Sequence, residues 1–180
     1  MANQAQPAKS AKPAKLASPR VAHARMQAWV VSLLTLVAHA YDSGEVLGAG
    51  VQLGQAKNVL APDASLLLSS EEDAPAAPAI PALAVSILSA EVTHTQRRQW
   101  CEQYADAGVH EYWQIDVDAG LAQLYQRNAA GQFDEIPPDG EGLHFSSVIA
   151  ELVFPVVWFA DRPNIWQMMD WWGLIDEEEE

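Results

Sequence analysis

The chain has 180 residues, of which 49% are hydrophobic, so it is long enough to bury one core in a single domain. It contains 24 acidic residues against 10 basic ones, and its formal net charge is -14 at pH 7. Because affinity for nucleic acids rests largely on Lys and Arg side chains that neutralise phosphates, this charge argues against tight unaided binding of DNA or RNA.

Both ends of the chain have biased composition. Residues 1–20 are rich in Ala, Lys, Pro, Gln and Ser, which predicts a disordered basic arm. The last five residues, 176–180, are all acidic and are expected to form a solvated tail. Residues 21–175 remain for the folded domain. The single cysteine, Cys101, cannot form an internal disulfide, which fits a reducing, cytoplasmic compartment.

Apolar residues recur at helical spacing from about Val21 to Tyr41, which predicts a helix with one buried face. A second interpretation of this segment remains open. Basic residues precede the apolar run 28–36, and an Ala-x-Ala pattern ends at Ala40, as in a secretory signal. The run itself is too short to span a bilayer, so no membrane association is expected.

The middle of the chain alternates between extended and helical patterns. Residues 45–53 and 59–68 predict a hairpin, and residues 69–81 predict a surface loop. The apolar run 83–88 is typical of a strand that is covered on both faces. Residues 95–107 then predict a helix that Gly108 closes.

A second hairpin, 109–117 and 121–126, follows with Asp118-Ala119-Gly120 at its turn. Apolar residues return at 146–159. Asn164 can then cap a helix that carries Ile165, Met168, Met169 and Trp172 on one face. The tryptophans Trp166, Trp171 and Trp172 indicate a helix docked on the sheet or an interface with a partner or a second copy.

Several residues between positions 61 and 116 stand in a specific order. Asp63 follows Pro62, a strand comes at 83–88, and Tyr104-x3-Gly108-Val109-x-Glu111-Tyr112-Trp113 is followed by Asp116. This combination resembles the Uma2 family of restriction-endonuclease-like proteins, which have the PD-(D/E)XK nuclease fold, and the similarity runs from about Val21 to Phe159. The resemblance implies an α/β fold: a restriction-endonuclease-like mixed β-sheet flanked by helices, in a single domain.

The resemblance also implies metal-dependent hydrolysis of DNA phosphodiesters, with Mg or Mn as the cofactor of an active member. Laid on this chain, the family's metal-binding Asp falls on Asp63. The family's Glu falls on Ser86, its helix Asp on Gln96 and its Lys on Trp100. Mg²⁺ is held by carboxylates and a nearby Lys stabilises the charge on the phosphate, so these replacements predict an impaired enzyme that needs no cofactor.

Three hypotheses about function follow. The first is an impaired nuclease that acts through protein contacts or as a homodimer. The second is an active endonuclease in which Glu91, with Arg97 or Arg98, supplements Asp63 as the only retained metal ligand. The third is a secreted protein released after Ala40. Under the first hypothesis Trp100 fills the cleft, and Glu111 joins the helix to the strand by hydrogen bonds.

Overall fold

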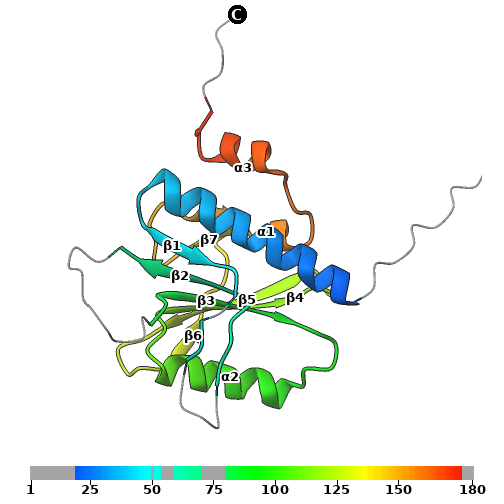
Figure 1. Cartoon of the computed structure of the whole chain (residues 1–180), viewed down its shortest axis with the longest axis vertical. Coiled ribbons are helices and arrows are strands. Elements are labelled where there is room, and N and C mark those ends of the chain that lie inside the picture. The colour runs from blue at the N-terminus through cyan, green and yellow to red at the C-terminus, as the bar shows by residue number, and fades with distance from the viewer. Residues whose placement is uncertain (1–18, 50, 54–58, 70–79, 176–180) are drawn as a thin grey trace, which may run out of the picture.

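The computed structural model of the chain describes residues 19–49, 51–53, 59–69 and 80–175, and it contains a central sheet with helices on both faces (Figure 1). The helices are α1 (Pro19–Ala40), α2 (His94–Asp106), the 3-10 helix η1 (Val156–Phe159) and α3 (Ile165–Trp171). The strands are β1 (Gly44–Leu47), β2 (Ala64–Leu68), β3 (Leu83–Leu88), β4 (Glu111–Asp116), β5 (Leu121–Arg127), β6 (Phe133–Glu135), β7 (Leu143–Phe145) and β8 (Val153–Pro155). The predicted arm and acidic tail fall mainly on residues 1–18 and 176–180, outside the described residues.

Six strands form one mixed sheet in the order β1-β2-β3-β4-β5-β6. Strands β3 and β4 are parallel, and α2 makes the crossover that a parallel pair requires. The other neighbours in this sheet are antiparallel, and β7 and β8 form a separate small sheet. The predicted mixed sheet flanked by helices in a single domain is therefore confirmed.

Successive side chains of the two central strands point to opposite faces of the sheet, as the strand period of two requires. On β3, Val85 and Ile87 belong to the core under α1, whereas Ala84 packs in the cluster under α2. Figure 1 shows the same division, with α1 and α3 on one side of the sheet and α2 on the other. All six residues of β3 are buried, as the apolar run predicts.

The predicted first helix is confirmed, and it begins at Pro19 rather than at Val21. The turn that ends it contains one left-handed residue. Asp42, not a glycine, adopts the left-handed conformation, with φ of 49°. Gly44 is required for a different reason, because a Cβ there would overlap the carbonyl oxygen of Leu67 on the paired strand.

The expectation that this segment is too short to span a bilayer also needs correction. The whole helix has 22 residues and a mean hydropathy of 1.3 over its most apolar window, so it is long enough to cross a bilayer, although the run 28–36 alone is not. In the fold, however, six of its residues are buried against the sheet and α3. A core helix can have the same length and hydropathy, so these two properties alone are weak evidence for a membrane span.

Two further sequence predictions are refined by the structure. The first hairpin is confirmed, but its paired strands β1 and β2 are shorter than expected, with one isolated bridge between Leu53 and Leu60. The predicted surface loop falls mostly on residues 70–79, outside the described part of the chain. Asn164 caps α3 as predicted, because its side chain accepts hydrogen bonds from the amides of Trp166 and Gln167.

Candidate functional site

Asp63 lies just before β2, and the protein itself binds both of its carboxylate oxygens. The amide of Ile87 donates to Oδ2 at 2.7 Å, and Nε2 of His23 lies 2.8 Å from Oδ1. The backbone amide of Asp63 also donates to the carbonyl of Val85. These contacts continue the pairing of β2 with β3 and fix the orientation of the carboxylate.

Two residues of α1, His23 and Gln27, also contact Asp63. His23 and Gln27 are one helical turn apart, so they lie on the same face of the helix. Nε2 of Gln27 donates to the backbone carbonyl of Asp63 at 2.8 Å and to that of Gly48 at 2.6 Å. Sequence analysis missed His23 and Gln27, although their spacing near the start of an amphipathic helix was the available signal.

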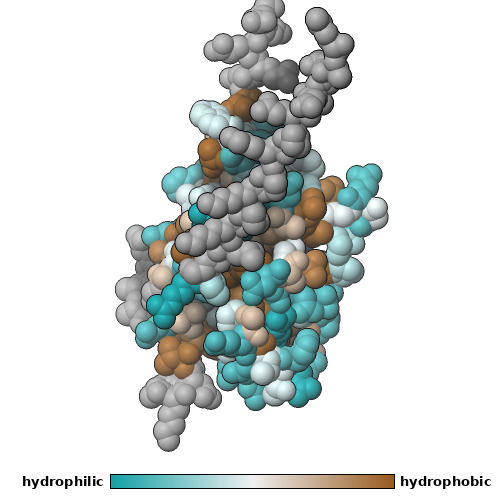
Figure 2. All heavy atoms as spheres, turned by 90° about the vertical axis from the view of Figure 1, so that its right-hand side faces the viewer, coloured by the Kyte–Doolittle hydropathy of each residue, from teal (hydrophilic) through white to brown (hydrophobic). Residues whose placement is uncertain are grey.

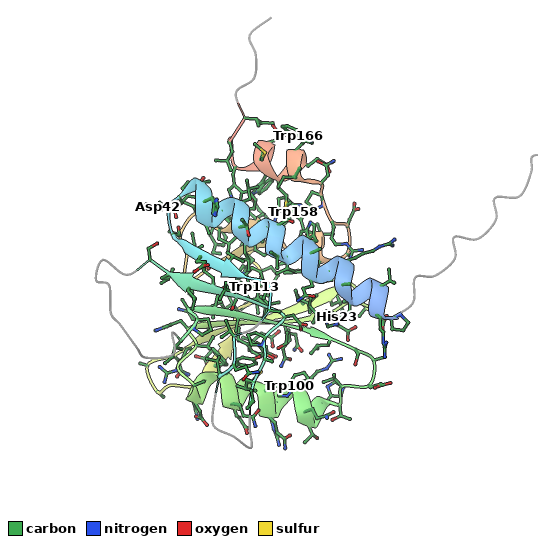
Figure 3. All side chains as sticks on the ribbon, in the orientation of Figure 1. His23, Asp42, Trp100, Trp113, Trp158 and Trp166 are labelled. Carbon is green, nitrogen blue, oxygen red and sulfur yellow. The ribbon has the colours of Figure 1, made fainter. Side chains whose placement is uncertain are left out.

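The structure brings three of the predicted site residues together. Asp63, Ser86 and Trp100 line one pocket of about 150 Å³, between the end of β3 and α2. Ser86 is buried beside Tyr104 and Tyr112, and burial raises the pKa of Tyr104 to about 12 while the Ser86 side chain opposes that shift. In Figure 3 Trp100 lies between α2 and the sheet.

This pocket does not fit a magnesium or manganese ion. Among the residues that the structure describes, Asp63 is the only carboxylate that lines it, and each of its carboxylate oxygens already has one hydrogen-bond partner. A hard divalent cation would have to compete with His23 and Ile87 for this one carboxylate, with no second carboxylate from the described residues to support it. Within the described ranges, no group of three or more His, Cys, Asp or Glu residues could hold a metal ion.

Gln96 and Glu91 lie elsewhere. Gln96 forms a capping box at the start of α2: its amide donates to Oγ1 of Thr93, and its Oε1 accepts from the amide of Thr93 at 3.0 Å. The exposed Glu91 lines a different pocket, which His23 also lines. His23 therefore stands between Asp63 and the pocket that contains Glu91.

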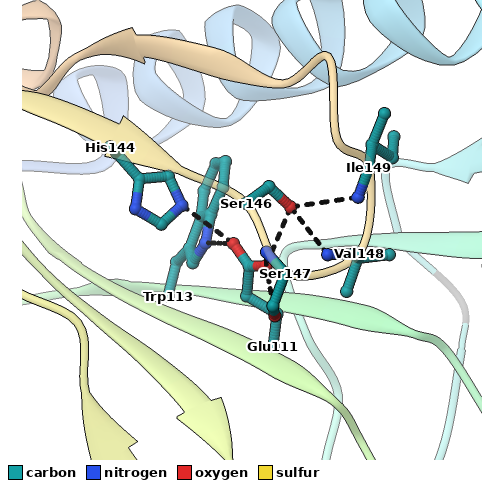
Figure 4. A network of polar contacts seen from close by, with 7 residues as sticks. All are labelled: Glu111, Trp113, His144, Ser146, Ser147, Val148 and Ile149. Atoms are coloured by element: carbon teal, nitrogen blue, oxygen red, sulfur yellow. Dashed lines mark hydrogen bonds and ion pairs between the residues drawn. The ribbon is translucent and has the colours of Figure 1, made fainter.

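Glu111 is at the centre of a buried polar network (Figure 4). Both Glu111 and His144 are fully buried, and Nε2 of His144 lies 2.9 Å from Oε1 of Glu111. Because a carboxylate only accepts, this ring nitrogen must carry the proton. The indole of Trp113 donates to the same oxygen at 2.7 Å, and Ser146 and Ser147 donate to Oε2.

The network corrects the role expected for Glu111. It does not join α2 to the strand; it joins β4 to β7 and the segment that follows β7. Burial acts to raise the pKa of Glu111, but the hydrogen bond and electrostatic attraction of His144, with the bonds from Ser146 and Trp113, hold the pKa below its ordinary value. Glu111 is therefore a structural anchor.

The two arginines considered as substitutes for the Lys that the resemblance implies lie on the other flank of α2. Nη2 of Arg97 donates to Oδ2 of Asp116 at 2.8 Å, and Arg98 pairs weakly with Glu102 at 3.7 Å. Both arginines line a pocket that Asp63 does not line. Asp116 also accepts from the amide of Ala119, so its side chain stabilises the start of the turn between β4 and β5.

The sequence profile described as "Putative restriction endonuclease" matches residues 15–159, which is most of the chain. The chain belongs to the Uma2 family. The Uma2 resemblance inferred from Asp63 and the Tyr104–Asp116 segment is thereby confirmed. No curated protein sequence matches the chain.

A solved structure shares the fold of this Uma2 member. It is a crystal structure described as "a putative nuclease belonging to DUF820" from Anabaena variabilis, and the similarity has a TM-score of 0.57. The two sequences are 18% identical, and the similarity covers 84% of this chain and 82% of the other. At this level of identity the likeness shows the fold alone.

Proposed function

We propose that this Uma2 family member has a catalytically impaired nuclease site and that it acts through protein contacts, including self-assembly. The observation that carries the proposal is the state of Asp63, whose two carboxylate oxygens are bound by Ile87 and His23. Ser86 and Trp100 complete the same pocket without supplying a charge. Replacing residues that act together in catalysis commonly lowers the reaction rate by several orders of magnitude.

A cleavage assay tests the impaired site. We expect no metal-dependent cleavage of supercoiled or linear DNA by the purified chain with Mg²⁺ or Mn²⁺, and the same background from Asp63→Asn. The Asn variant keeps an oxygen that can accept from Ile87, so the comparison does not depend on unfolding. Cleavage by the parent chain that Asp63→Asn abolishes, while exposed Asp161→Asn retains it, would show that the site is active.

The same assay distinguishes the impaired site from the alternative, an active site rearranged around Asp63 and Glu91. That alternative needs metal-dependent cleavage that is lost in Glu91→Gln as well as in Asp63→Asn. It also needs a metal-dependent increase in thermal stability, because a ligand that binds only the folded state opposes unfolding. The separation of the two carboxylates into different pockets, with His23 between them, favours the impaired site.

The surface around α3 supports a role in protein contacts. Trp166 and Trp171 are 65% and 45% exposed, and Ile165 is 42% exposed. Beside them, a groove of about 660 Å³ lies between α1 and α3. The indole nitrogens of Trp171 and Trp172 donate to carbonyls of β8 and the preceding turn, so α3 is docked on the fold while Trp166 remains free for a partner (Figure 3).

The oligomeric state tests self-assembly. We expect the chain to form a dimer at micromolar concentration and Trp166→Ser to shift the equilibrium towards monomer by about tenfold or more, since exposed tryptophans often carry much of an interface's energy. Sedimentation equilibrium measures this. Ile80→Ser, which removes a 55% exposed apolar side chain near the end of α2, should change nothing. A strictly monomeric parent chain would refute self-assembly.

The remaining parts of the proposal concern location and partners. We place the protein in the cytoplasm, where a lone thiol such as Cys101 stays reduced. We expect weak binding of DNA at best, because the net charge of -14 opposes the approach of a polyanion.

A further inference from the structure

The imidazole of His23 is held in one orientation by Asp63. The carboxylate is itself fixed, because its Oδ2 accepts from the amide of Ile87 at 2.7 Å while its Oδ1 lies 2.8 Å from Nε2 of His23. A carboxylate only accepts hydrogen bonds, so Nε2 carries a proton, and in the neutral ring the free lone pair is on Nδ1. A carboxylate that sets the tautomer of a histidine in this way is a recurring part of catalytic sites.

The second ring nitrogen of His23, Nδ1, is accessible. It has no hydrogen-bond partner within the described ranges of the chain, and it is not one of the buried polar atoms that lack a partner there. The side chain of His23 is 36% exposed, although its Nε2 is bound to Asp63. The nitrogen with the lone pair therefore reaches the surface, where it can take a proton from a water molecule.

His23 lines a pocket of about 720 Å³ at the carboxyl ends of the parallel strands β3 and β4. Ligands in α/β sheets commonly bind outside these strand ends. The apolar residues of the lining are Ala22, Leu88, Ala90 and Val117. Figure 2 looks onto the end of the molecule where α1 begins, and apolar and polar side chains adjoin there. The pocket has the size and the mixed lining of a site for a small organic molecule.

The charges of this pocket favour a neutral substrate. Glu91 and Asp118 are exposed and line it, so they repel phosphates and carboxylates. Arg20 also lines the pocket, three residues before His23 and on the same face of α1. A guanidinium in this place can stabilise negative charge that develops on a carbonyl oxygen. A neutral carbonyl compound with an apolar group therefore fits better than a phosphodiester.

We propose that His23 is a general base that hydrolyses small neutral carboxylic esters without a metal, and that Asp63 is its positioning residue. Nδ1 takes a proton from water as the water oxygen attacks the carbonyl carbon. The bond from that carbon to the alcohol oxygen then breaks, and the imidazolium gives the proton to the leaving oxygen. The products are the carboxylic acid and the alcohol, and His23 is regenerated. The activity does not depend on the nuclease site, because Asp63 acts here as a hydrogen-bond acceptor.

Hydrolysis of p-nitrophenyl acetate and p-nitrophenyl butyrate by the full chain in excess EDTA tests the proposal. We expect turnover at least about 100-fold faster than with free imidazole at the same concentration, since a positioned general base contributes about 10²–10⁴-fold. The KM should be lower for the butyrate, whose longer acyl chain buries more apolar surface. His23→Gln keeps a donor for Asp63 and should lose the turnover. His110→Gln, which changes an exposed histidine of a different pocket, should retain it.

Asp63→Asn tests the positioning role. The amide of Ile87 needs the side-chain oxygen at position 63 as its acceptor, so the new amide nitrogen faces Nε2 of His23. That ring nitrogen must then accept, and the proton moves to Nδ1, which can no longer act as a base. We expect kcat to fall by about 100-fold or more with KM little changed. The nitrogen NMR signals of the imidazole should show the exchange of the protonated position, which a purely structural pair would not couple to the rate.

The imidazole signals of the parent chain keep the test decisive if a variant fails to fold, because they show which nitrogen of His23 carries the proton. Four results would overturn the proposal. They are turnover no faster than with free imidazole, loss of turnover in EDTA, full turnover by His23→Gln, and a neutral imidazole in the parent chain that is protonated on Nδ1.

Discussion

Replacing Glu111 with Ala should lower the free energy of unfolding by about 3–5 kcal/mol, because it removes a buried carboxylate on which several buried donors depend. The substitution leaves His144, Trp113, Ser146 and Ser147 without their common acceptor, in a region where Glu111 and His144 are fully buried. Urea unfolding at neutral pH measures the loss. A cost below about 1 kcal/mol, as for a surface pair, would contradict the anchoring role.

Glu102→Ala provides the matched control, because Glu102 belongs to an ion pair that is largely exposed. It should change the free energy of unfolding by no more than about 1 kcal/mol. The His144→Ala variant should reproduce part of the Glu111→Ala effect, since it removes the imidazole that donates to Oε1 of Glu111. The double variant should then cost less than the sum of the two single ones.

The same residue predicts a pH dependence. The pKa of Glu111 is lower in the folded chain than in the unfolded chain, so its contribution to stability is fully present above the ordinary value of about 4.3. That contribution is lost as the pH falls from there through the lowered pKa. Unfolding titrations between about pH 7 and about pH 3 should therefore show a steeper acid loss for the parent chain than for Glu111→Gln.

The second large effect concerns α1. A chain that begins at Tyr41, as cleavage after Ala40 would produce, should not fold cooperatively. It would lose the buried residues Met26, Val30, Leu33, Leu34, Val37 and Ala38, which cover the sheet. Each large apolar side chain contributes about 1.5–3 kcal/mol when it is buried, and together they match the whole free energy of unfolding, about 5–15 kcal/mol.

Thermal unfolding followed by circular dichroism measures whether the shortened chain unfolds cooperatively. Two variants of the full chain serve as references. Leu34→Ala should cost about 2–5 kcal/mol and keep a cooperative transition. The exposed Ser32→Ala should change the free energy of unfolding by less than about 0.5 kcal/mol. A sharp, cooperative transition in the chain that begins at Tyr41 would instead support the hypothesis of a secreted form.

Local sequence patterns predicted a helix or strand well where the segment carried one clear signal, such as an apolar run or a capping residue. The apolar run 83–88 is β3, and the signals around Asn164 and in the helix 95–107 predicted α3 and α2. The short strands β6, β7 and β8 were not predicted, because three residues are too few to establish a period of two. They are stabilised by pairing with distant partners, which no local window contains.

By itself, the sequence determined the family and the mixed sheet between helices, and it predicted that Ser86, Gln96 and Trp100 stand where the family has charged residues. The tertiary structure alone decided what the remaining polar residues do. His23 is 40 residues from Asp63, and His144 is 33 residues from Glu111. Contacts over such separations depend on how helices and strands pack, because the partners are brought together only when the core is formed.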